Sequence, residues 1–379
     1  MSETAPKVAL IGQVPGKIWG LDLREWQRRA WQKIGAAGLA EDGQVLVGTD
    51  WILSPALQSG LLARSGVALV VEEVATGESR VAAIHMPVGA NAEDHEAAAA
   101  LVSRPTSEAA LGTLGIEPVS MTDLASDYNA ALRKTEAPYA LSLFTTAPGV
   151  IEKRQFKGSY KGVTDIVTKY AWPWPAFHVT RWAAAIGMKP NTVTTLSLVL
   201  VCVAFWLFWI GAWLPGIVAG WAMTFLDTVD GKLARTTMTY SKWGNIYDHG
   251  IDLIHPPFWY WAIYVGLMRD STTYDPAWLM GALVVILVIY VLNRLEELAF
   301  MRRFGFHIHV WRPVDSFMRT ITARRNPNLL IFMLAVLVGF PETGFLMVAV
   351  WTVACFIFHG VRLLQAFVSR QPVTSWMDR

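Results

Sequence analysis

Apolar runs of about 20 residues or slightly fewer fill the second half of this 379-residue chain, and they restrict its fold more than any other feature. A helix needs about 20 predominantly apolar residues to cross a bilayer. Six runs of this kind are counted, at 191–211, 213–235, 245–268, 276–303, 327–341 and 344–367. The sequence therefore predicts an α-helical integral membrane bundle of six transmembrane helices, covering residues 191–370.

The charged residues between these runs predict how the chain is oriented. Three connections, 211–215, 269–276 and 341–344, contain a single cation among them. The opposite side is rich in cations: Lys232, Arg235, Lys242, Arg302, Arg303, Arg312, Arg319, Arg324, Arg325, Arg362 and Arg370. Because basic loops stay in the cytosol, we expect a multi-pass protein of the inner or plasma membrane, with both termini and the aspartate-rich segment described below on the cytosolic side.

Residues 1–150 have the pattern of a soluble α/β domain. Short apolar strands are expected at 7–12, 44–50, 67–74 and 79–87, and helices at 21–38, 54–66 and 91–104. Strands that alternate with helices are typical of a parallel, Rossmann-like layer. The start of the chain lacks the basic and apolar regions of a signal peptide, so we expect this domain to be cytosolic.

A basic and aromatic hinge, residues 151–190, separates the two parts. Its cations are Lys153, Arg154, Lys157, Lys161, Lys169 and Arg181, and its larger rings include Trp172, Trp174, Phe177 and Trp182. Aromatic rings at headgroup level with cations beside them are typical of a segment that lies in the membrane interface. We therefore predict an interfacial helix here, with a solvated linker as the alternative.

Four aspartates lie next to apolar runs, where a carboxylate is energetically costly. Asp227 and Asp230 are three residues apart, and Asp248 and Asp252 are four apart. Each spacing puts a pair on one helix face, and consecutive antiparallel helices would bring the two pairs together. Close carboxylates repel one another, and divalent cations such as Mg²⁺, Mn²⁺ or Ca²⁺ resolve this conflict. The pattern favours a two-metal site for phosphoryl or phosphodiester displacement.

The same segment satisfies the spacing D-x2-D-G-x2-A-R-x8-G-x3-D-x3-D at every fixed position: Asp227, Asp230, Gly231, Ala234, Arg235, Gly244, Asp248 and Asp252. In this it resembles the CDP-alcohol phosphotransferases, integral membrane enzymes that make phosphodiesters. The stretch 189–198 is similar to the opening of that family's first span. The resemblance covers about residues 160–370 and implies six spans after an interfacial helix.

The resemblance also implies residue roles, with two ions, Mg²⁺ or Mn²⁺, as cofactors. Metal ligation is implied for Asp227, Asp230, Asp248 and Asp252. Contact with a CDP-alcohol donor is implied for Gly231, Ala234, Arg235, Gly244, Asn191 and Thr194. Asp252 is further implied as the base that takes the proton of the acceptor hydroxyl, which becomes esterified to the donor's phosphate while CMP departs. A homodimer and membrane lipids are the expected partners, and no nucleic acid is expected.

The β-α-β start of the N-terminal domain, the run 45–71 and the junction stretches 160–170 and 189–194 together resemble fused cytidylyltransferase–di-inositol phosphate synthases, in which a nucleotidyltransferase-like domain comes first. An active domain of that type opens with a glycine-rich loop that holds a cation against the triphosphate. The stretch 10–20 has Gly12, Gly16 and Lys17 but lacks the G-x-G-[ST]-R pattern. Asp50, after the second strand, is interpreted as a helix cap, with metal binding as the alternative. We predict a degenerate domain that docks, regulates or dimerises.

The acceptor is predicted from the basic segment 300–329. A helix over 313–325 would place Asp315, Arg319 and Thr322 on one face. One hypothesis is that Arg319 and Arg324, with Arg294, line a pocket for a phosphate-bearing group; the other is that these cations only attract anionic headgroups. The HIH stretch at 307–309 is expected to face solvent or headgroups.

Three functions remain open at this point. A phospholipid-type product is favoured, because the interfacial hinge and the lateral aromatic residues suit a lipid that enters sideways. Synthesis of a soluble di-polyol phosphate from a CDP-polyol is the alternative suggested by the fused architecture. An ion-coupled transporter is the third, because carboxylates inside membranes also line ion paths.

Overall fold

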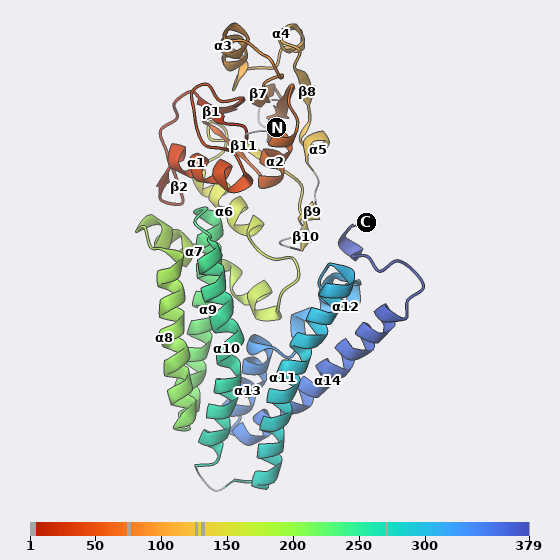
Figure 1. Cartoon of the computed structure of the whole chain (residues 1–379). Coiled ribbons are helices and arrows are strands. Elements are labelled where there is room, and N and C mark those ends of the chain that lie inside the picture. The colour runs from red at the N-terminus through yellow and green to blue at the C-terminus, as the bar shows by residue number, and fades with distance from the viewer. Residues whose placement is uncertain (1–4, 74–76, 126–127, 130–132, 270–271, 379) are drawn as a thin grey trace.

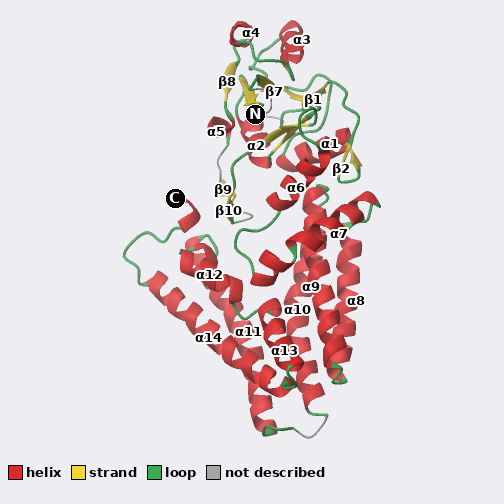
Figure 2. Ribbon diagram, turned by 180° about the vertical axis from the view of Figure 1, so that it is seen from behind, coloured by secondary structure: helices red, strands yellow, loops and turns green. Residues whose placement is uncertain are grey.

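In the computed structural model of the chain, an α/β unit caps one end of an elongated helix bundle (Figure 1). The described residues are 5–73, 77–125, 128–129, 133–269 and 272–378. The C-terminus lies near α12, at the end of the bundle that faces the α/β unit (Figures 1 and 2). The α/β unit and the helix bundle are thus two distinct regions of the structure.

The N-terminal part is built on a five-stranded sheet in the order β1-β4-β7-β6-β8. Its strands are β1 (Val8–Ile11), β4 (Val45–Gly48), β7 (Ser79–His85), β6 (Val67–Glu72) and β8 (Glu117–Val119). Strand β1 is parallel to β4 and β6 is parallel to β8, but β7 is antiparallel to both of its neighbours. The prediction of a parallel layer is wrong for β7, because the connection from β6 is too short for a parallel crossover.

Three helices of the N-terminal part, α1 (Leu23–Ile34), α2 (Pro55–Ala63) and α3 (Ala92–Leu101), lie close to their predicted positions. Two short helices, α4 (Glu108–Thr113) and α5 (Met121–Leu124), were not predicted. Short strand pairs complete it: β2 (Lys17–Ile18) with β3 (Leu21–Asp22), β5 (Trp51–Leu53) with β11 (Ala140–Ser142), and β9 (Tyr128–Asn129) with β10 (Lys134–Thr135). The sheet buries apolar residues on both faces, including Val47, Leu69 and Ala83 on one and Leu46, Ala68 and Ile84 on the other.

The β2–β3 hairpin anchors the N-terminal part to the helices that follow it. Trp19 and Gly20 form the turn with φ values of 52° and 71°. Glycine is required at position 20, since a Cβ there would lie 2.5 Å from the carbonyl oxygen of Ala184. Trp19 is fully buried, and its indole Nε1 donates to Gln155 at 2.7 Å while its backbone N donates to Glu152 at 2.9 Å. The hairpin tip is therefore packed into the hinge region.

The hinge itself is largely helical. It contains α6 (Pro148–Gly158), a π-helical turn (Val167–Ala171) and α7 (Pro173–Ala185). On these elements Tyr170, Trp174 and Trp182 are exposed large side chains. Phe156 and Phe177 pack against Trp19 with ring centroids 6.2 and 6.1 Å away. The hinge thus has one face packed against protein and rings on its outer surface.

Each predicted apolar run corresponds to a helix of the bundle. The bundle contains α8 (Pro190–Trp209), α9 (Trp213–Thr236), α10 (Lys242–Leu267), α11 (Pro276–Phe304), α12 (Pro313–Ile321), α13 (Arg325–Leu337) and α14 (Pro341–Phe367). Among the described residues, α8, α11 and α14 are long and apolar enough to cross a membrane by length and composition. Charged residues interrupt α9 and α10, and α13 has 13 residues.

Candidate active site

Two consecutive antiparallel helices, α9 and α10, bring three of the four aspartates together. The Ser241 hydroxyl oxygen caps α10 by accepting from the backbone N of Gly244 at 3.0 Å, which fixes where the second helix begins. Asp227 and Asp230 lie on α9, and Asp248 lies on α10. One carboxylate oxygen of each lies within 4.8 Å of the others. The predicted convergence of the two pairs is confirmed for these three residues.

The fourth aspartate is joined to the group through an arginine. Asp252 forms an ion pair with Nη1 of Arg325, whose Nη2 lies 2.5 Å from Oδ2 of Asp227. The Asp252 side chain is 41% exposed, whereas that of Asp227 is 17% exposed. Sequence reasoning gave Arg325 no role at this site. The one signal available in the sequence was its position in the pair of arginines that precedes the fifth apolar run.

The donor set of this cluster fits a hard divalent cation. Three carboxylates supply oxygen ligands, which Mg²⁺, Mn²⁺ and Ca²⁺ prefer. Asp230 is 3% exposed and accepts a hydrogen bond from Oγ1 of Thr194 at 2.7 Å. Such a bond orients a ligating carboxylate and tunes it. Thr194, predicted to contact the CDP donor, therefore lies behind a carboxylate of the candidate metal centre.

Two glycines near the aspartates provide room for neighbouring side chains. A Cβ at Gly231 would lie 3.1 Å from Nη2 of Arg235, and a Cβ at Gly244 would lie 3.0 Å from Oδ1 of Asn191. Both glycines have helical backbone conformations. Glycine is therefore favoured at these positions by the nearby side chains and not by a positive φ. Together with Ala234, these predicted donor-binding residues line one cavity.

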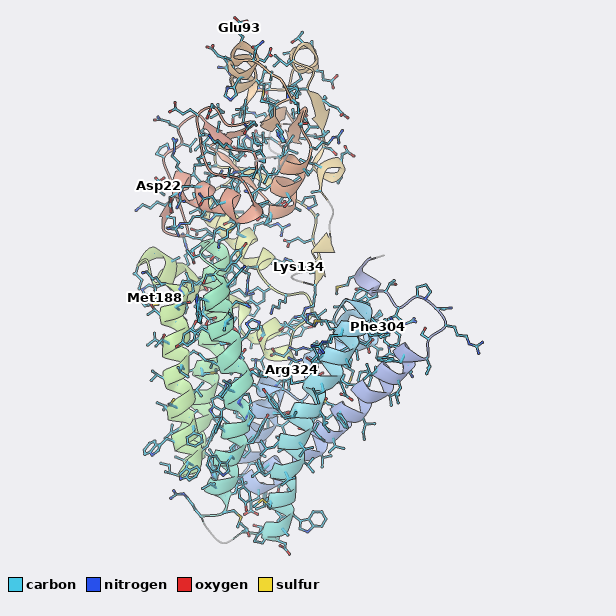
Figure 3. The ribbon with its side chains drawn as sticks, viewed as in Figure 1. Asp22, Glu93, Lys134, Met188, Phe304 and Arg324 are labelled. Carbon is cyan, nitrogen blue, oxygen red and sulfur yellow. The ribbon has the colours of Figure 1, made fainter. Side chains whose placement is uncertain are left out.

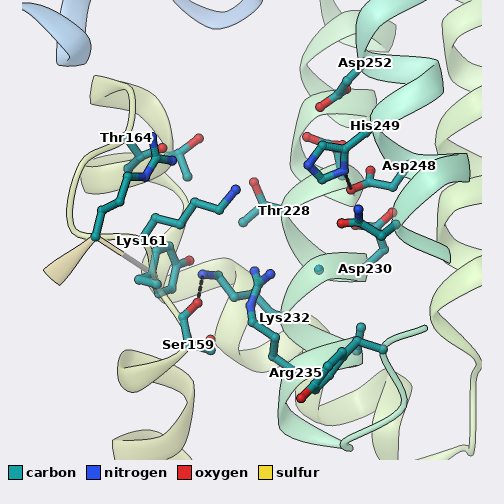
Figure 4. A pocket seen from close by; sticks show the side chains of 18 of the residues that line it. Ser159, Lys161, Thr164, Thr228, Asp230, Lys232, Arg235, Asp248, His249 and Asp252 are labelled. Atoms are coloured by element: carbon teal, nitrogen blue, oxygen red, sulfur yellow. Dashed lines mark hydrogen bonds and ion pairs between the residues drawn. The ribbon is translucent and has the colours of Figure 1, made fainter. Parts of the chain in front are cut away.

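That cavity, of about 1490 Å³, is lined by residues from the N-terminal part, the hinge and the bundle. In the close view, Thr228, Asp230 and Asp248 face Lys161 across it, with Lys232 and Arg235 to one side (Figure 4). The predicted metal, donor and acceptor residues all belong to its lining. Its walls therefore combine an acidic patch on α9 and α10 with cations from several elements.

The three arginines predicted for the acceptor line the cavity but are not equivalent. Nη1 of Arg294 lies 3.5 Å from Glu297, and Arg324 also forms an ion pair with Glu297. Arg324 lies at the end of the bundle that faces the N-terminal part (Figure 3). Nε and Nη1 of Arg319 are buried and lack a hydrogen-bond partner among the described residues. Burial, and then the positive charge of Arg324, lower the pKa of Arg319. Of the three arginines, Arg319 would therefore be stabilised most by a bound anion.

The helix predicted over 313–325 is confirmed up to residue 321 and is wrong for its last four residues. Helix α12 ends at Ile321, and Thr322 has an extended ψ of 139°. Pro327 has no N–H to continue a helix from the preceding turn, but it is accommodated in the first turn of α13. Asp315 is buried and accepts from Nε and Nη2 of Arg362 at 2.6 and 2.9 Å, so it does not share a site with Arg319.

The structure corrects the interpretation of the HIH stretch for Ile308 and His309, whereas His307 is exposed as expected. His309 is 2% exposed, and its Nε2 lies 3.3 Å from Oε1 of Glu297. The chain turns inward here because residues 308–310 form a short 3-10 helix that packs on α11 and α12. His309 therefore supports the Glu297 carboxylate and does not face solvent.

Asp50, a candidate residue of the N-terminal domain, is held by two hydroxyl groups. Asp50 is buried and accepts from the hydroxyls of Ser103 at 2.6 Å and Ser142 at 2.8 Å. The interpretation of Asp50 as a helix cap is wrong, because strand β5 separates it from α2, whose N-cap is Ser54. Gly12 and Gly16 have open space around them, and the chain beyond them forms the β2–β3 hairpin that buries Trp19.

Comparison with known proteins identifies the helical part. Residues 188–321 match the family model described as CDP-alcohol phosphatidyltransferase. The chain carries a CDP-alcohol phosphatidyltransferase domain. All eight fixed positions of the aspartate motif lie within it, whereas Arg324, Arg325 and the N-terminal part lie outside the matched residues.

Curated relatives of the CDP-alcohol phosphatidyltransferase domain match part of the chain. Cholinephosphotransferase 1 of Danio rerio is 28% identical over 119 residues, which are 28% of this chain and 30% of that protein. Archaetidylinositol phosphate synthase of Pyrococcus horikoshii is 30% identical over 102 residues, which are 26% of this chain and 54% of that protein. The chain thus spans about a third of the first relative and about half of the second.

Solved structures with a distant likeness include Mycobacterium tuberculosis phosphatidylinositol phosphate synthase (PgsA1). Its apo form aligns with a TM-score of 0.39 and 20% identity, covering 52% of this chain and 98% of that chain. The form in complex with manganese and citrate aligns with a TM-score of 0.40 and 18% identity, covering 52% and 93%.

Proposed function

We propose that this protein is a membrane-embedded CDP-alcohol phosphotransferase. It transfers a phospho-alcohol group from a CDP-alcohol donor to an acceptor hydroxyl, forms a phosphodiester and releases CMP. The observation that carries the proposal is the cluster of Asp227, Asp230 and Asp248, which lies inside the matched domain with carboxylate oxygens within 4.8 Å of one another. A cavity large enough for a nucleotide and an acceptor opens beside the cluster.

The aspartate cluster is proposed to hold divalent cations, Mg²⁺ or Mn²⁺. Asp227, Asp230 and Asp248 would supply the carboxylate ligands, and Asp252, which is paired with Arg325 in this structure, would supply a fourth. When bound, such ions neutralise a pyrophosphate and stabilise the oxygen that leaves with CMP. The Thr194 hydroxyl holds the Asp230 carboxylate in its ligating orientation.

The remaining residues bind and orient the reactants. Arg235 presents its guanidinium to the donor phosphates, and Gly231 leaves room for that side chain. Asn191, Ala234 and Gly244 shape the adjoining wall for the CDP moiety. The acceptor oxygen attacks the donor phosphorus that bears the alcohol, the bond from that phosphorus to the CMP oxygen breaks, and the hydroxyl proton passes to the Asp252 carboxylate. This is direct transfer without a covalent enzyme intermediate.

A phospholipid-type product is proposed over a soluble di-polyol phosphate. An apolar groove of about 850 Å³ runs between α8 and α10, and Asn191 lines both this groove and the main cavity. Leu198, Phe205 and Trp243 belong to the groove lining. A substrate with acyl chains in the groove would have its headgroup at the aspartates. Arg319, which also lines the cavity, is proposed to bind a phosphate of the acceptor or of a lipid headgroup. Arg294 and Arg324 are weaker candidates because both are paired with Glu297.

The membrane arrangement is part of the same proposal. We propose six spans, namely α8 to α11, α13 and α14, with both termini and the active site in the cytosol and α7 in the interface. The exposed Trp174 and Trp182 of α7 are suited to the headgroup level. A homodimer remains an expectation. The N-terminal domain is proposed to dock on the bundle and not to transfer nucleotides, since the hairpin that replaces the phosphate loop buries Trp19.

The decisive experiment uses the purified protein in detergent with radiolabelled CDP-diacylglycerol or CDP-polyols and candidate acceptors. CMP release that needs a divalent metal supports the phosphotransferase. Partition of the labelled product into chloroform supports a phospholipid, and a product that stays wholly in water supports the soluble alternative. Metal-dependent ion flux without CMP release would favour the transporter. Pyrophosphate release from CTP with alcohol phosphates would contradict the docking role of the N-terminal domain.

A further inference from the structure

The segment 159–165, between α6 and the π-helical turn, crosses the cavity although it lies outside the matched domain. Its first residues are fixed to the catalytic helix α9. Nζ of Lys232, which is 3% exposed, donates to the carbonyl oxygen of Ser159 at 3.1 Å. The same Nζ lies 3.1 Å from the centroid of the Tyr160 ring. Lys232, two residues after Asp230 on α9, therefore holds this end of the segment.

The other end of the segment is fixed to α13. Asp165 is buried and accepts from Nδ2 of Asn326 and from the backbone N of Thr168, both at 3.0 Å. Between the two ends, a Cβ at Gly162 would lie 2.4 Å from the carbonyl oxygen of Arg133, so the backbone there packs closely on the start of β10. The segment is thus held by the N-terminal part and by two helices of the bundle at once.

Lys161 lies between these anchors and extends into the cavity. Figure 4 shows its ammonium group directed toward Thr228, with Asp230 and Asp248 on the far wall. Within the described part of the chain, Lys161 has no hydrogen-bond or ion-pair partner. The charges that act on it come from Arg133, Arg235, Arg319 and Asp248. Three of these four are cations, so the protein supplies too little negative charge for this group.

Burial and those cations lower the pKa of Lys161 to about 8. The Lys161 side chain is half-buried. Partial withdrawal of an ammonium from water without a partner costs free energy, and an anion in the cavity would offset that cost. Lys157, four residues earlier, is exposed and does not line the cavity. The two lysines therefore differ in their access to a ligand in the cavity.

We propose that Lys161 binds a phosphate group of a substrate, so that the segment joining the N-terminal part to the bundle contributes a residue to the phosphotransferase site. The inference rests on the proposed function for the identity of the substrates. The ligand chemistry is a phosphate or pyrophosphate anion. Its source is either the donor pyrophosphate, on the Arg235 side, or a phosphate of the acceptor, on the Arg319 side.

The test compares full-length wild type with Lys161→Ala, Lys161→Arg and the control Lys157→Ala. Binding of CDP and of inorganic phosphate is measured by calorimetry in detergent with Mg²⁺. Loss of one charge-assisted contact corresponds to about 10- to 100-fold weaker binding. We expect that loss in Lys161→Ala, near wild-type binding in Lys161→Arg, and no change in Lys157→Ala. Weaker CDP binding alone identifies the donor, and weaker phosphate binding alone identifies the acceptor.

Unchanged binding of both probes to Lys161→Ala, or no binding of either probe to the wild type, would overturn the proposal. Where Lys161→Ala does not fold, Lys161→Met keeps the apolar stem and carries the same expectation. Binding does not require turnover. A wild type that releases no CMP would therefore refute the transferase, while a lysine-dependent loss of CDP or phosphate binding would still support the contact.

Discussion

Arg325, at the first turn of α13, forms an ion pair with Asp252 of α10, 73 residues away in the sequence. The same guanidinium reaches Asp227, so one cation joins the two aspartate-bearing helices. In the absence of metal, this arginine offsets the repulsion between carboxylates that the motif brings together.

Removal of this cation is expected to make folding depend on metal. Arg325→Ala leaves Asp227 and Asp252 without their partner, which costs about 1–3 kcal/mol, below the range for fully buried pairs because Asp252 is partly exposed. The thermal midpoint without metal should fall, and Mg²⁺ should raise it more than in the wild type. Arg302→Ala, which removes an exposed arginine, is the control. Equal Mg²⁺ shifts in both variants would contradict this role.

The Thr194 hydroxyl is expected to tune metal affinity through Asp230. Thr194→Val removes the 2.7 Å hydrogen bond to the Asp230 carboxylate. Loss of an outer-shell partner of this kind weakens metal binding by about 10- to 100-fold. Titration of CMP release with Mn²⁺ should show this loss, and Thr194→Ser should restore the affinity.

The matched control for this hydroxyl is Thr195→Val. Oγ1 of Thr195 donates to the carbonyl oxygen of Asn191, and among the described residues it has no hydrogen bond to an aspartate. If Thr194→Val and Thr195→Val have the same metal dependence, Asp230 does not act as a ligand that needs orientation.

Gly231 is expected to be needed for tight binding of the CDP donor. In Gly231→Ala the new methyl group would press on Nη2 of Arg235, which lies 3.1 Å from its position. The KM for the CDP donor should rise several-fold to about tenfold, with a smaller effect on the acceptor KM, since a shifted guanidinium loses part of a contact worth about 1.5 kcal/mol. Steady-state kinetics with each substrate varied in turn measures the difference.

Gly281→Ala serves as the control for that substitution. This glycine lies inside α11 with nothing within 4 Å of its Cβ position. Alanine there should stabilise the helix by up to about 1 kcal/mol and leave both KM values unchanged. A donor KM that rises equally in both variants would assign the effect to helix propensity.

Phosphate binding is expected to weaken as the pH rises through about 8. Lys161 has a pKa of about 8 in the folded protein, against an ordinary value of 10.5. Its ammonium is therefore charged below pH 8 and neutral above it, and the charged form is the one that binds phosphate. CDP and phosphate affinities measured from pH 7.5 to 9.5 should fall, while in Lys161→Arg they should stay flat because arginine stays charged.

The same shift has a consequence for stability. Because the pKa of Lys161 is lower in the folded than in the unfolded chain, the charged lysine opposes folding below pH 8. This cost declines as the pH rises from 8 to 10.5. Lys161→Met should therefore raise the thermal midpoint at pH 7 when no anion is present. A midpoint that falls at pH 7 would mean that the lysine already has a stabilising partner.

Local patterns in the sequence predicted the elements and the aspartate pairs. The spacings of three and four residues put each pair on one helix face, and the apolar runs gave the positions of the bundle helices. These features depend on neighbours within one helical turn. The antiparallel direction of β7 could not be predicted in the same way, since the alternation of strands and helices does not reveal which connection is a hairpin.

Contacts between distant segments were decided only by the tertiary structure. Arg319 and Arg324 have the same residue type and neighbouring positions, yet Glu297 pairs with Arg324, while two nitrogens of Arg319 stay without a partner among the described residues. Likewise, the sequence does not distinguish Lys161 from the other lysines of the hinge. In the structure, hydrogen bonds from Lys232 and Asn326 fix the backbone on either side of it. Sequence periodicity determines which face of a helix a side chain occupies, whereas the partner on that face depends on how helices far apart in the chain pack against one another.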